Sequence, residues 1–395
     1  MSYSAAEPGG ASSPPDPNAA IEDLVDIFRD WLAANATELA SYTRAPVGDI
    51  DVCVAAGRPL QRLLSDAGWT RLGWPVECGG LGGSPLQRAA VLEALAAGGY
   101  VIPEVHGTVE IIAPMLLRFA PEIAAASLPA ALAGDEVWCQ GFSEPDAGSD
   151  LGSLRTRATP AGAGFRVSGQ KMWSSWGHVA QRCCLLARTG EPDSGYRGLT
   201  MFWMDMDAPG VSVRPTQCES GRAEVAEIFL DDVIIPADRL IGGLGDGWRT
   251  VMHLMQFERG AYAWQRQADL HTELQHLVGR GGDYPDDAAA VVGDAYLALF
   301  ALRSQCSRTI AELAAGRDLG PEISIDKLML GMTEQVVADA ARHLLWPSIE
   351  LDDDPTSVAW RQRWAFSRIT TIYGGVAEVQ RDLVAERILH LPRVR

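Results

Sequence analysis

The most informative segment of the sequence runs from Gly169 to His178 and reads GQKMWSSWGH. Trp173 offers a flat apolar face, and Ser175 follows two residues later, so the two side chains share one side of a strand. That pairing suits an isoalloxazine ring, which needs stacking on one face and a hydrogen bond at N5. Two tryptophans in an ordinary core are the alternative that these residues alone leave open.

Short strand-like segments lie before and after Gly169–His178 in the sequence. Most of them are rich in β-branched or aromatic residues, and Gly, Pro and Asp turns separate them. The segments are Phe165–Val167, Cys183–Ala187, Leu199–Met204, Val211–Val213 and Ala226–Leu230. Together they predict a small middle antiparallel β domain over residues 137–244.

Helical periodicity occupies both sides of that β block. Apolar residues at three- and four-residue spacing predict an N-terminal α-helical domain over residues 21–136 and a C-terminal helical bundle over residues 245–395. The helices expected in the bundle are Trp248–Val278 as one long helix, Ala288–Ala315, Ser324–Leu345 and Val358–Arg387. The expected class is α+β, and a cofactor cleft is expected where such units meet.

The first twenty residues differ from the helical domains. They read MSYSAAEPGGASSPPDPNAA, without a positively charged side chain or an apolar core, so they are no signal peptide. Their composition predicts a disordered lead-in over residues 1–20. No run approaches the roughly 20 apolar residues that span a membrane. A cytoplasmic protein without a membrane span is therefore expected.

The net charge and the cysteines narrow the possible partners. A net charge of −18 argues against a broad basic surface for nucleic acid. A polyanionic ligand would need local help from arginines, helix N-termini or backbone amides. The seven cysteines are scattered, without zinc-like spacing to histidine, so reduced thiols and no metal site are expected.

A second segment, QGFSEPDAGSD from Gln140 to Asp150, lies about thirty residues before the first. The hydroxyls of Ser143 and Ser149 stand among small residues at a strand-to-loop transition. Backbone amides exposed at such a place can meet a phosphate or a flavin edge. An ordinary Gly/Ser/Asp turn is the alternative.

The two segments together resemble the paired signatures of the acyl-CoA dehydrogenase family. The resemblance continues in Cys183–Arg188, in VIIPADRLI at Val233–Ile241, and in IYGGVAEVQR at Ile372–Arg381. It covers nearly the whole chain after the lead-in. It implies an acyl-CoA dehydrogenase-like fold and FAD as cofactor. The implied reaction removes the α-proton of an acyl-CoA with a carboxylate and passes the β-hydrogen as hydride to flavin N5. The product would be the trans-2-enoyl-CoA, and an electron-transfer flavoprotein would reoxidise the flavin.

The resemblance also implies a set of site residues. Residues that match the family's flavin contacts are Phe142, Ser143, Gly148, Ser149, Trp173, Ser175 and Glu378. Residues that match its substrate contacts are Ser149, Arg259, Tyr373 and Gly374. For Arg259 a plain salt bridge is the alternative, and for Tyr373 the alternative is a core side chain.

The catalytic base has two possible homes in this family. Many members keep a glutamate one residue after the tyrosine of the C-terminal motif, but that position here is Gly374. A second group, which includes isovaleryl- and long-chain-type enzymes, places the base on the long helix, where this chain has Glu258. Absence at one site and presence at the other predict that Glu258 is the catalytic base and reaches the space beside Gly374. A solvated helix carboxylate is the alternative.

The chain departs from the family in the motifs that reach a neighbouring subunit's FAD. Arg-x-x-Phe-Gly and Gln-x-x-Gly-Gly are missing, and Gly279–Tyr284 and Leu345–Asp353 stand in their places. One interpretation is half of a composite site, completed by a paralogous partner as in bacterial heteromeric steroid-CoA-type dehydrogenases. The other is a homo-oligomer that uses a substitute such as Arg280.

Two further functions stay open at this point. The chain could be an oxygen-using flavoprotein on the same scaffold, or a non-catalytic or half-site subunit of a heteromeric enzyme. Retention of Glu258 and Trp173 favours a catalytic subunit.

Overall fold

The computed structural model describes residues 13–43, 48–281 and 284–392. Its N-terminal helices are α1 (Ile21–Ala34), α2 (Ala36–Leu39), α3 (Ile50–Asp66), α4 (Pro85–Ala97), α5 (Glu104–Phe119) and α6 (Pro121–Leu132). Its strands are β1 (Trp138–Gly141), β2 (Arg157–Ala161), β3 (Gly164–Ser175), β4 (Arg182–Arg188), β5 (Leu199–Asp205), β6 (Val211–Thr216), β7 (Val225–Pro236) and β8 (Leu240–Ile241). Its C-terminal helices are α7 (Gly247–Arg259), α8 (Ala261–Gly279), α9 (Ala288–Ala314), α10 (Ile323–Leu344), α11 (Ser348–Leu351), α12 (Pro355–Ile369) and α13 (Ala377–Leu383), and the last is followed by a π-helical turn over Val384–Ile388.

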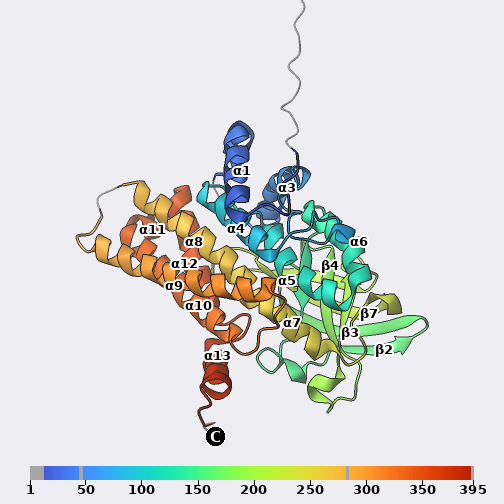
Figure 1. Ribbon diagram of the computed structural model, residues 1–395. Coiled ribbons are helices and arrows are strands. Elements are labelled where there is room, and N and C mark those ends of the chain that lie inside the picture. Colours follow the sequence, from blue (N-terminus) through green and yellow to red (C-terminus); the bar gives the residue numbers. More distant parts are fainter. Residues whose placement is uncertain (1–12, 44–47, 282–283, 393–395) are drawn as a thin grey trace, which may run out of the picture.

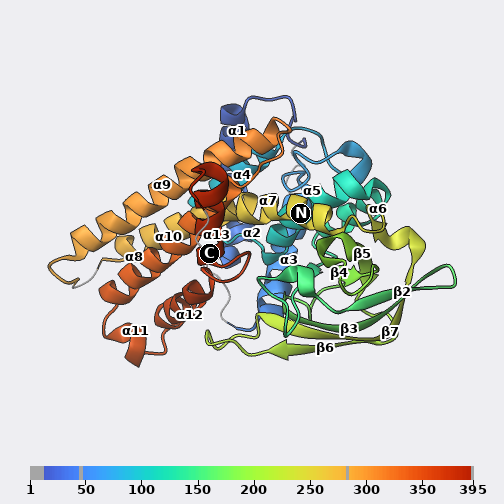
Figure 2. The same ribbon diagram turned by 90° about the horizontal axis from the view of Figure 1, so that it is seen from below.

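The order of helices, strands and helices agrees with the α+β class expected from the sequence. In Figure 1 the sheet lies at the lower right, beneath α5 and α6, and the long helices α8, α9 and α10 extend to the left. The view from below shows β2, β3, β7 and β6 as a layer on the side of the sheet away from α5 and α6 (Figure 2). Helix α7 connects the sheet to the helical bundle.

The sheet is mostly antiparallel and curls around a core of its own. Its strand order is β6-β7-β3-β2-β4-β5-β8, and β1 and β2 each pair with β4 in parallel. Along β4, Cys183 and Leu185 face the core inside the sheet, while Cys184 and Leu186 face the helices. Both faces of β4 are thus buried, one of them by the sheet itself. The helices cover only one face of β4, because the other face packs inside the curled sheet.

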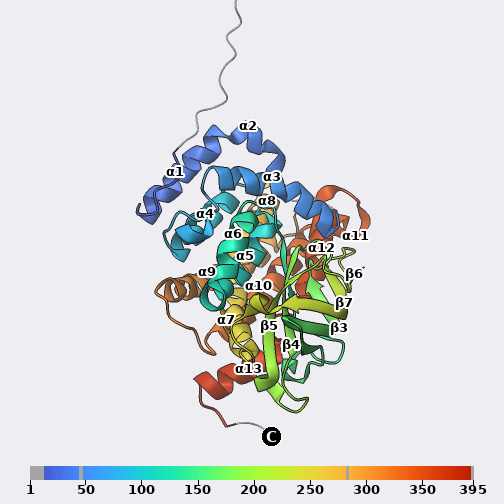
Figure 3. The ribbon, with the colours of Figure 1, turned by 90° about the vertical axis from the view of Figure 1, so that its right-hand side faces the viewer.

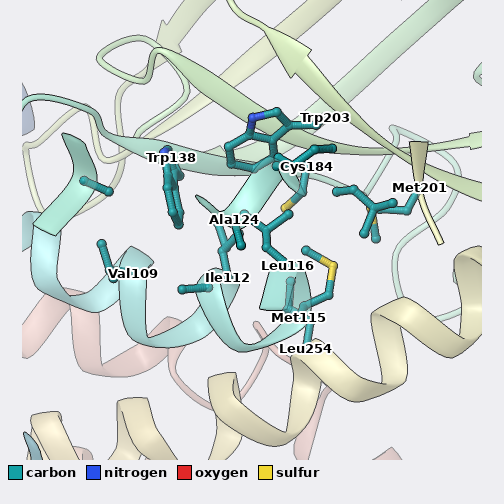
Figure 4. Close-up of a cluster of buried hydrophobic side chains, with 14 of the residues drawn as sticks. Val109, Ile112, Met115, Leu116, Ala124, Trp138, Cys184, Met201, Trp203 and Leu254 are labelled. Carbon is teal, nitrogen blue, oxygen red and sulfur yellow. The ribbon is translucent and has the colours of Figure 1, made fainter. Parts of the chain in front are cut away.

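The core between helices and sheet joins all three parts of the chain. Figure 4 shows Ile112 and Leu116 of α5 beside Trp138 of β1, Cys184 of β4 and Leu254 of α7. The rings of Trp138 and Trp203 meet edge to face, with their centroids 5.2 Å apart. Because these residues come from elements far apart in sequence, this core fixes α7 against β1 and β4. That fixed position decides where Glu258 points.

Residues 13–20 differ from the disordered lead-in expected over residues 1–20. Pro15 is buried, and the carbonyl oxygens of Pro17 and Ala19 accept hydrogen bonds from Gln87 Nε2 at 2.9 and 3.2 Å. Gln87 belongs to the capping box that begins α4, so a helix terminus secures this stretch. Composition does not reveal such a partner in advance. Residues 1–12 lie outside the described residues.

The expected single helix over residues 248–278 is two helices that meet at Gly260. The backbone there has φ −101° and ψ −65° and separates α7 from α8. A β-carbon on Gly260 would stand 2.7 Å from Thr309 Cγ2 and 3.1 Å from Ile323 Cδ1. The close approach of α9 and α10 therefore requires glycine at this bend. Side-chain periodicity continues across the bend, which is why the sequence pattern does not show it.

The expected helix over residues 358–387 is likewise interrupted. Helix α12 ends at Ile369 and α13 begins at Ala377, and the turn between them contains Gly374 and Gly375. Both glycines have left-handed φ values, 63° and 108°, which other residues rarely adopt. Figure 3 shows α13 at the foot of the molecule, away from α12. The turn brings residue 374 to the end of α7.

None of the helices in the described part of the chain is both long enough and apolar enough to cross a bilayer.

Candidate active site

Glu258 and Gly374 meet at the centre of the candidate active site. Glu258 is the penultimate residue of α7, and Gly374 lies in the turn that follows α12. A β-carbon on Gly374 would stand 2.7 Å from Glu258 Oε1. The other carboxylate oxygen, Oε2, is buried and accepts no hydrogen bond from the described residues. The carboxylate thus occupies the space beside residue 374 and keeps one oxygen unpaired.

The electrostatics of Glu258 are those of a carboxylate prepared to accept a proton. Burial raises the pKa of its carboxyl group, while the charges of Arg259 and Lys327 and the amide of Gln140 oppose that rise. Gln140 lies in β1, at the start of the QGFSEPDAGSD segment. Glu258 is therefore in contact with the β domain as well as with the C-terminal helices.

Two cations lie close to this carboxylate. Arg259 Nε donates to the carbonyl oxygen of Gly374 at 3.0 Å, which ties the turn to α7. Lys327 of α10 is almost completely buried, and burial lowers its pKa to about 8, although Glu258 acts in the opposite direction. Its Nζ lies 3.9 Å from the centre of the Tyr373 ring and donates to the carbonyl oxygen of Thr370. Arg259 and Lys327 thus place positive charge beside both the turn and the Glu258 carboxylate.

A buried ion pair joins the two segments that the sequence singled out. Lys171 of β3 is fully buried, and its Nζ lies 2.8 Å from Glu144 Oε1 and 3.0 Å from the carbonyl oxygen of Phe142. Glu144 also accepts hydrogen bonds from the backbone N–H groups of Arg155 and Thr156, at 2.6 and 2.8 Å. With these partners satisfied, the pair fixes the loop after β1 against the middle of β3.

Trp173 lies in a β-bulge. Lys171 pairs with Ile228 of β7 and Ser174 pairs with Ala226, and between these two pairs β3 has one residue more than β7. Trp173 has a left-handed φ of 60° there, unusual for a bulky side chain, and it leaves 58% of its surface exposed. Backbone strain of this kind concentrates at binding sites. Ser175 is exposed as well, and the residue between them, Ser174, is buried.

The remaining predicted flavin contacts lie in three places. Phe142 is buried and Ser143 partly buried directly after β1, and Met172 N donates to Ser143 O at 2.8 Å, so this stretch adjoins the bulge. Gly148 and Ser149 stand exposed at the tip of the same loop, with open space around Gly148. Glu378 is exposed on α13, and its ion pair is with Arg381 of that helix. The structure thus does not bring Glu378 to the bulge.

Sequence reasoning gave no role to four residues that hold the site together. They are Gln140, Glu144, Lys171 and Lys327. The first three lie inside the quoted segments, where alternation along β3 would have placed Lys171 on a buried face. No signal in the sequence marks Lys327, because a lysine on a long amphipathic helix ordinarily faces solvent. Across the described ranges, no group of three or more His, Cys, Asp or Glu side chains is placed to hold a metal ion.

Comparisons with known proteins agree with this architecture. The chain matches the family models for the acyl-CoA dehydrogenase N-terminal domain over residues 22–135, middle domain over residues 139–233 and C-terminal domain over residues 245–389. The chain therefore belongs to the acyl-CoA dehydrogenase family and is an acyl-CoA dehydrogenase enzyme.

Among its relatives, the acyl-CoA dehydrogenase IpdE1 of Mycobacterium tuberculosis is 35% identical, over 94% of this chain and 98% of the relative. The acyl-CoA dehydrogenase FadE34 of the same organism is 34% identical, over 84% of this chain and 46% of the relative. A solved structure described as the Tcur3481–Tcur3483 steroid ACAD has a TM-score of 0.80 and 24% identity, over 96% of this chain and 100% of that one. The ChsE4–ChsE5 complex from Mycobacterium tuberculosis has a TM-score of 0.76 and 26% identity, over 95% and 98%.

Members of this family are FAD-dependent flavoproteins, and the residues present fit that cofactor. The Trp173 indole is held outward by strained backbone, which gives a flat apolar surface for one ring face. Ser143 and Ser175 lie on adjacent stretches beside it. The exposed loop tip at Gly148 and Ser149 offers backbone amides and a hydroxyl to phosphate groups.

Proposed function

We propose that this enzyme catalyses the FAD-dependent α,β-dehydrogenation of an acyl-CoA thioester to the trans-2-enoyl-CoA, with Glu258 as the base. The observation that carries the proposal is the position of the Glu258 carboxylate, whose Oε1 lies in the space that Gly374 leaves and whose Oε2 is buried without a hydrogen-bond partner among the described residues. A proton α to a thioester is weakly acidic, so its removal needs a desolvated carboxylate close to it.

In this proposal the carboxylate of Glu258 accepts the α-proton. The charges of Arg259 and Lys327 keep the carboxylate ionised before transfer, and burial favours the neutral acid afterwards. The opposing effects bring the pKa towards the working pH, as proton transfer requires. FAD, when bound, would supply the acceptor for the β-hydrogen. Trp173 would hold the ring by stacking, Ser143 and Ser175 by hydrogen bonds, and Ser149 would lie near the ligands' phosphates.

Replacement of Glu258 tests the role of the base. The Glu258→Gln variant keeps the size and loses the charge, so flavin reduction by an acyl-CoA should slow by several orders of magnitude, with flavin still bound. Glu122→Gln, on the exposed side of α6, is the matched control and should reduce flavin at the wild-type rate. Unchanged reduction in Glu258→Gln would show that another group takes the proton.

We also propose that this chain works in an oligomer in which a partner subunit supplies the FAD contacts missing here. Arg280, the substitute considered for a homo-oligomer, is engaged by Thr356 within the chain. The C-terminal helices leave Leu297 and Phe300 of α9 and Met332 of α10 exposed. Exposed apolar residues of this size, gathered on neighbouring helices, are typical of a surface that a partner protein covers. The ChsE4–ChsE5 complex, similar in fold, has two different chains.

Purification of the chain with and without its paralogous partner tests this second proposal. The lone chain should bind little flavin, and the two together should bind one FAD per pair. Full flavin occupancy of the lone homo-oligomer would overturn the proposal.

During turnover with an electron-transfer flavoprotein, oxygen consumption should stay low. Rapid oxygen consumption would instead favour an oxygen-using flavoprotein.

A further inference from the structure

A buried carboxylate on α10 is the centre of a second polar network beside the candidate active site. Glu334 is 1% exposed and lies about two turns after Lys327 on the same helix. Its Oε1 accepts a hydrogen bond from Arg266 Nε of α8 at 2.7 Å, and its Oε2 accepts one from the hydroxyl group of Thr370. Both oxygens are therefore satisfied, and each of them connects α10 to a different part of the bundle.

Thr370 is the residue at which α12 ends and the turn to Gly374 begins. It is fully buried. Its hydroxyl group donates to Glu334, and its carbonyl oxygen accepts a hydrogen bond from Lys327 Nζ. The start of the turn is thus bound to α10 at two points, one of them a carboxylate and the other an ammonium group.

The turn also packs directly on α10. A β-carbon on Gly331 would stand 3.4 Å from the carbonyl oxygen of Thr370. Four residues after Thr370, a β-carbon on Gly374 would stand 3.5 Å from Lys327 Cε and 2.7 Å from Glu258 Oε1. Because both ends of the turn contact α10, a shift of Thr370 would change the space in which the Glu258 carboxylate lies.

Ion pairs hold Glu334 from the side of α8. Arg266 Nη1 lies 3.2 Å from Asp269 Oδ2, and Arg363 Nη1 of α12 lies 3.0 Å from the same oxygen. Arg363 Nη2 in turn lies 3.1 Å from Glu273 Oε1. Charges of alternating sign thus connect α8, α10 and α12. A buried charge with partners of this kind is costly to move, so Glu334 has one fixed position.

Glu334 also supports the charge of Lys327. Burial lowers the pKa of the lysine, and Glu258 and Glu334 are the two carboxylates that oppose this effect. In the proposed reaction Glu258 becomes neutral when it accepts the α-proton. Of the two, only Glu334 then keeps its negative charge beside the ammonium group.

Resting on the proposed function, we infer that Glu334 is a positioning residue for the catalytic base, and that it fixes the turn at Gly374 through Thr370 and Lys327. Glu258 carries the chemistry, and Glu334 determines where the Glu258 carboxylate stands. The alternative is an ion pair that only stabilises the helical bundle.

Two replacements of Thr370 test this inference without breaking the pair between Glu334 and Arg266. Thr370→Val removes the hydroxyl group and keeps the shape of the side chain, whereas Thr370→Ser keeps the hydroxyl group. The rate constant of reduction, measured per bound flavin, should fall about tenfold to a hundredfold in Thr370→Val and stay near the wild-type value in Thr370→Ser. The Kd of the enoyl-CoA product should be unchanged in both variants, because the positioning acts on the base and not on the ligand.

Thr333→Val is the matched control. Thr333 is a buried residue of α10 as well, but its hydroxyl group donates to the carbonyl oxygen of Ala298 on α9, at 3.5 Å. This variant should lose some stability in urea and keep the wild-type rate of flavin reduction. A Thr370→Val variant that behaves in the same way, less stable but equally fast, would leave Glu334 a role in stability alone and overturn the inference.

Glu334→Gln shows whether the carboxylate acts through Thr370. It should also slow flavin reduction, and the double variant with Thr370→Val should be no slower than the slower of the two single variants. Losses that multiply in the double variant would mean that the two side chains act separately, against the inference. If Glu334→Gln does not fold, the two Thr370 variants still decide the question. If no acyl-CoA reduces the flavin of the wild-type protein, the proposed function itself has failed.

Discussion

Glu258 Oε1 stands 2.7 Å from the place that a β-carbon on Gly374 would occupy, although the two residues belong to α7 and to the turn after α12. Gly374 also has a φ of 63°, which only glycine adopts readily. The carboxylate and the missing side chain are therefore complementary. A glutamate side chain in this position on α7 requires that residue 374 has no side chain, and Gly374 meets that requirement.

Addition of one methyl group at this position should slow catalysis. In Gly374→Ala the new β-carbon would displace the Glu258 carboxylate, and a displacement of about 1 Å can lower the rate roughly a hundredfold. The rate constant of flavin reduction in a single turnover measures this loss. Gly162→Ala introduces the same left-handed strain, with φ 59°, where nothing lies within 4 Å. The control should keep the wild-type rate, and an equal loss in both variants would mean that strain alone is responsible.

Lys327 should control the pH at which the base becomes active. Glu258 must be ionised to accept a proton, so kcat/KM falls as the pH falls through its pKa. The charge of Lys327 lowers that pKa against the larger effect of burial. In Lys327→Met the pKa should rise, and the acid side of the pH–rate profile should move to higher pH. The pH dependence of kcat/KM measures the shift.

Lys327→Arg is the matched control, because it keeps the positive charge and should leave the acid limb near its wild-type position. A Lys327→Met profile that loses rate at every pH without moving would show that the lysine only supports the turn at Thr370.

The fold class could be predicted from the sequence, because alternation and three- to four-residue spacing are strong signals over long segments. The family resemblance was confirmed by the three family models that match the chain. The two helix breaks were not readable. At Gly260 the apolar spacing continues across the break, and the close approach of α9 and α10 that requires a glycine there is not visible in the sequence. At Gly374 the turn is made by backbone angles that the pattern of side chains does not report.

The candidate site was readable only in part. Trp173, Ser143 and Glu258 stood in recognisable segments, and the structure places Ser143 beside the bulge and Glu258 against β1 through Gln140. The burial of Lys171 and Lys327 could not be predicted, because it depends on partners from elements that are distant in sequence. The roles of these two charges can be assigned only when the tertiary contacts are known.

Removal of Lys171 should loosen the flavin-facing surface. Lys171→Met would leave Glu144 buried without its cation, and breaking such a pair typically destabilises a protein by about 3–5 kcal/mol. Flavin content should fall as well, because the pair holds the loop that carries Ser143. Urea unfolding and the flavin-to-protein absorbance ratio measure the two effects.

The double variant Lys171→Met, Glu144→Gln removes both charges and should recover part of the lost stability. A double variant as unstable as the sum of the single ones would indicate that the two side chains act independently.

Asp326 of α10 should make the protein less stable as the pH rises. It is fully buried, accepts a hydrogen bond from Gln305 Nε2 at 2.9 Å, and burial raises its pKa from 3.8 to about 6. The unfolded chain releases this proton at lower pH than the folded one, so the stability due to the neutral acid is complete below pH 3.8 and is lost as the pH rises to about 6. Asp326→Asn, always neutral, should raise the free energy of unfolding above that range by about 2–3 kcal/mol at most, and by less in acid. Urea unfolding on both sides of the range measures the difference.

Asp294→Asn, on the exposed side of α9, is the matched control and should change stability little at either pH. An Asp326→Asn gain that does not vary with pH would contradict the assignment.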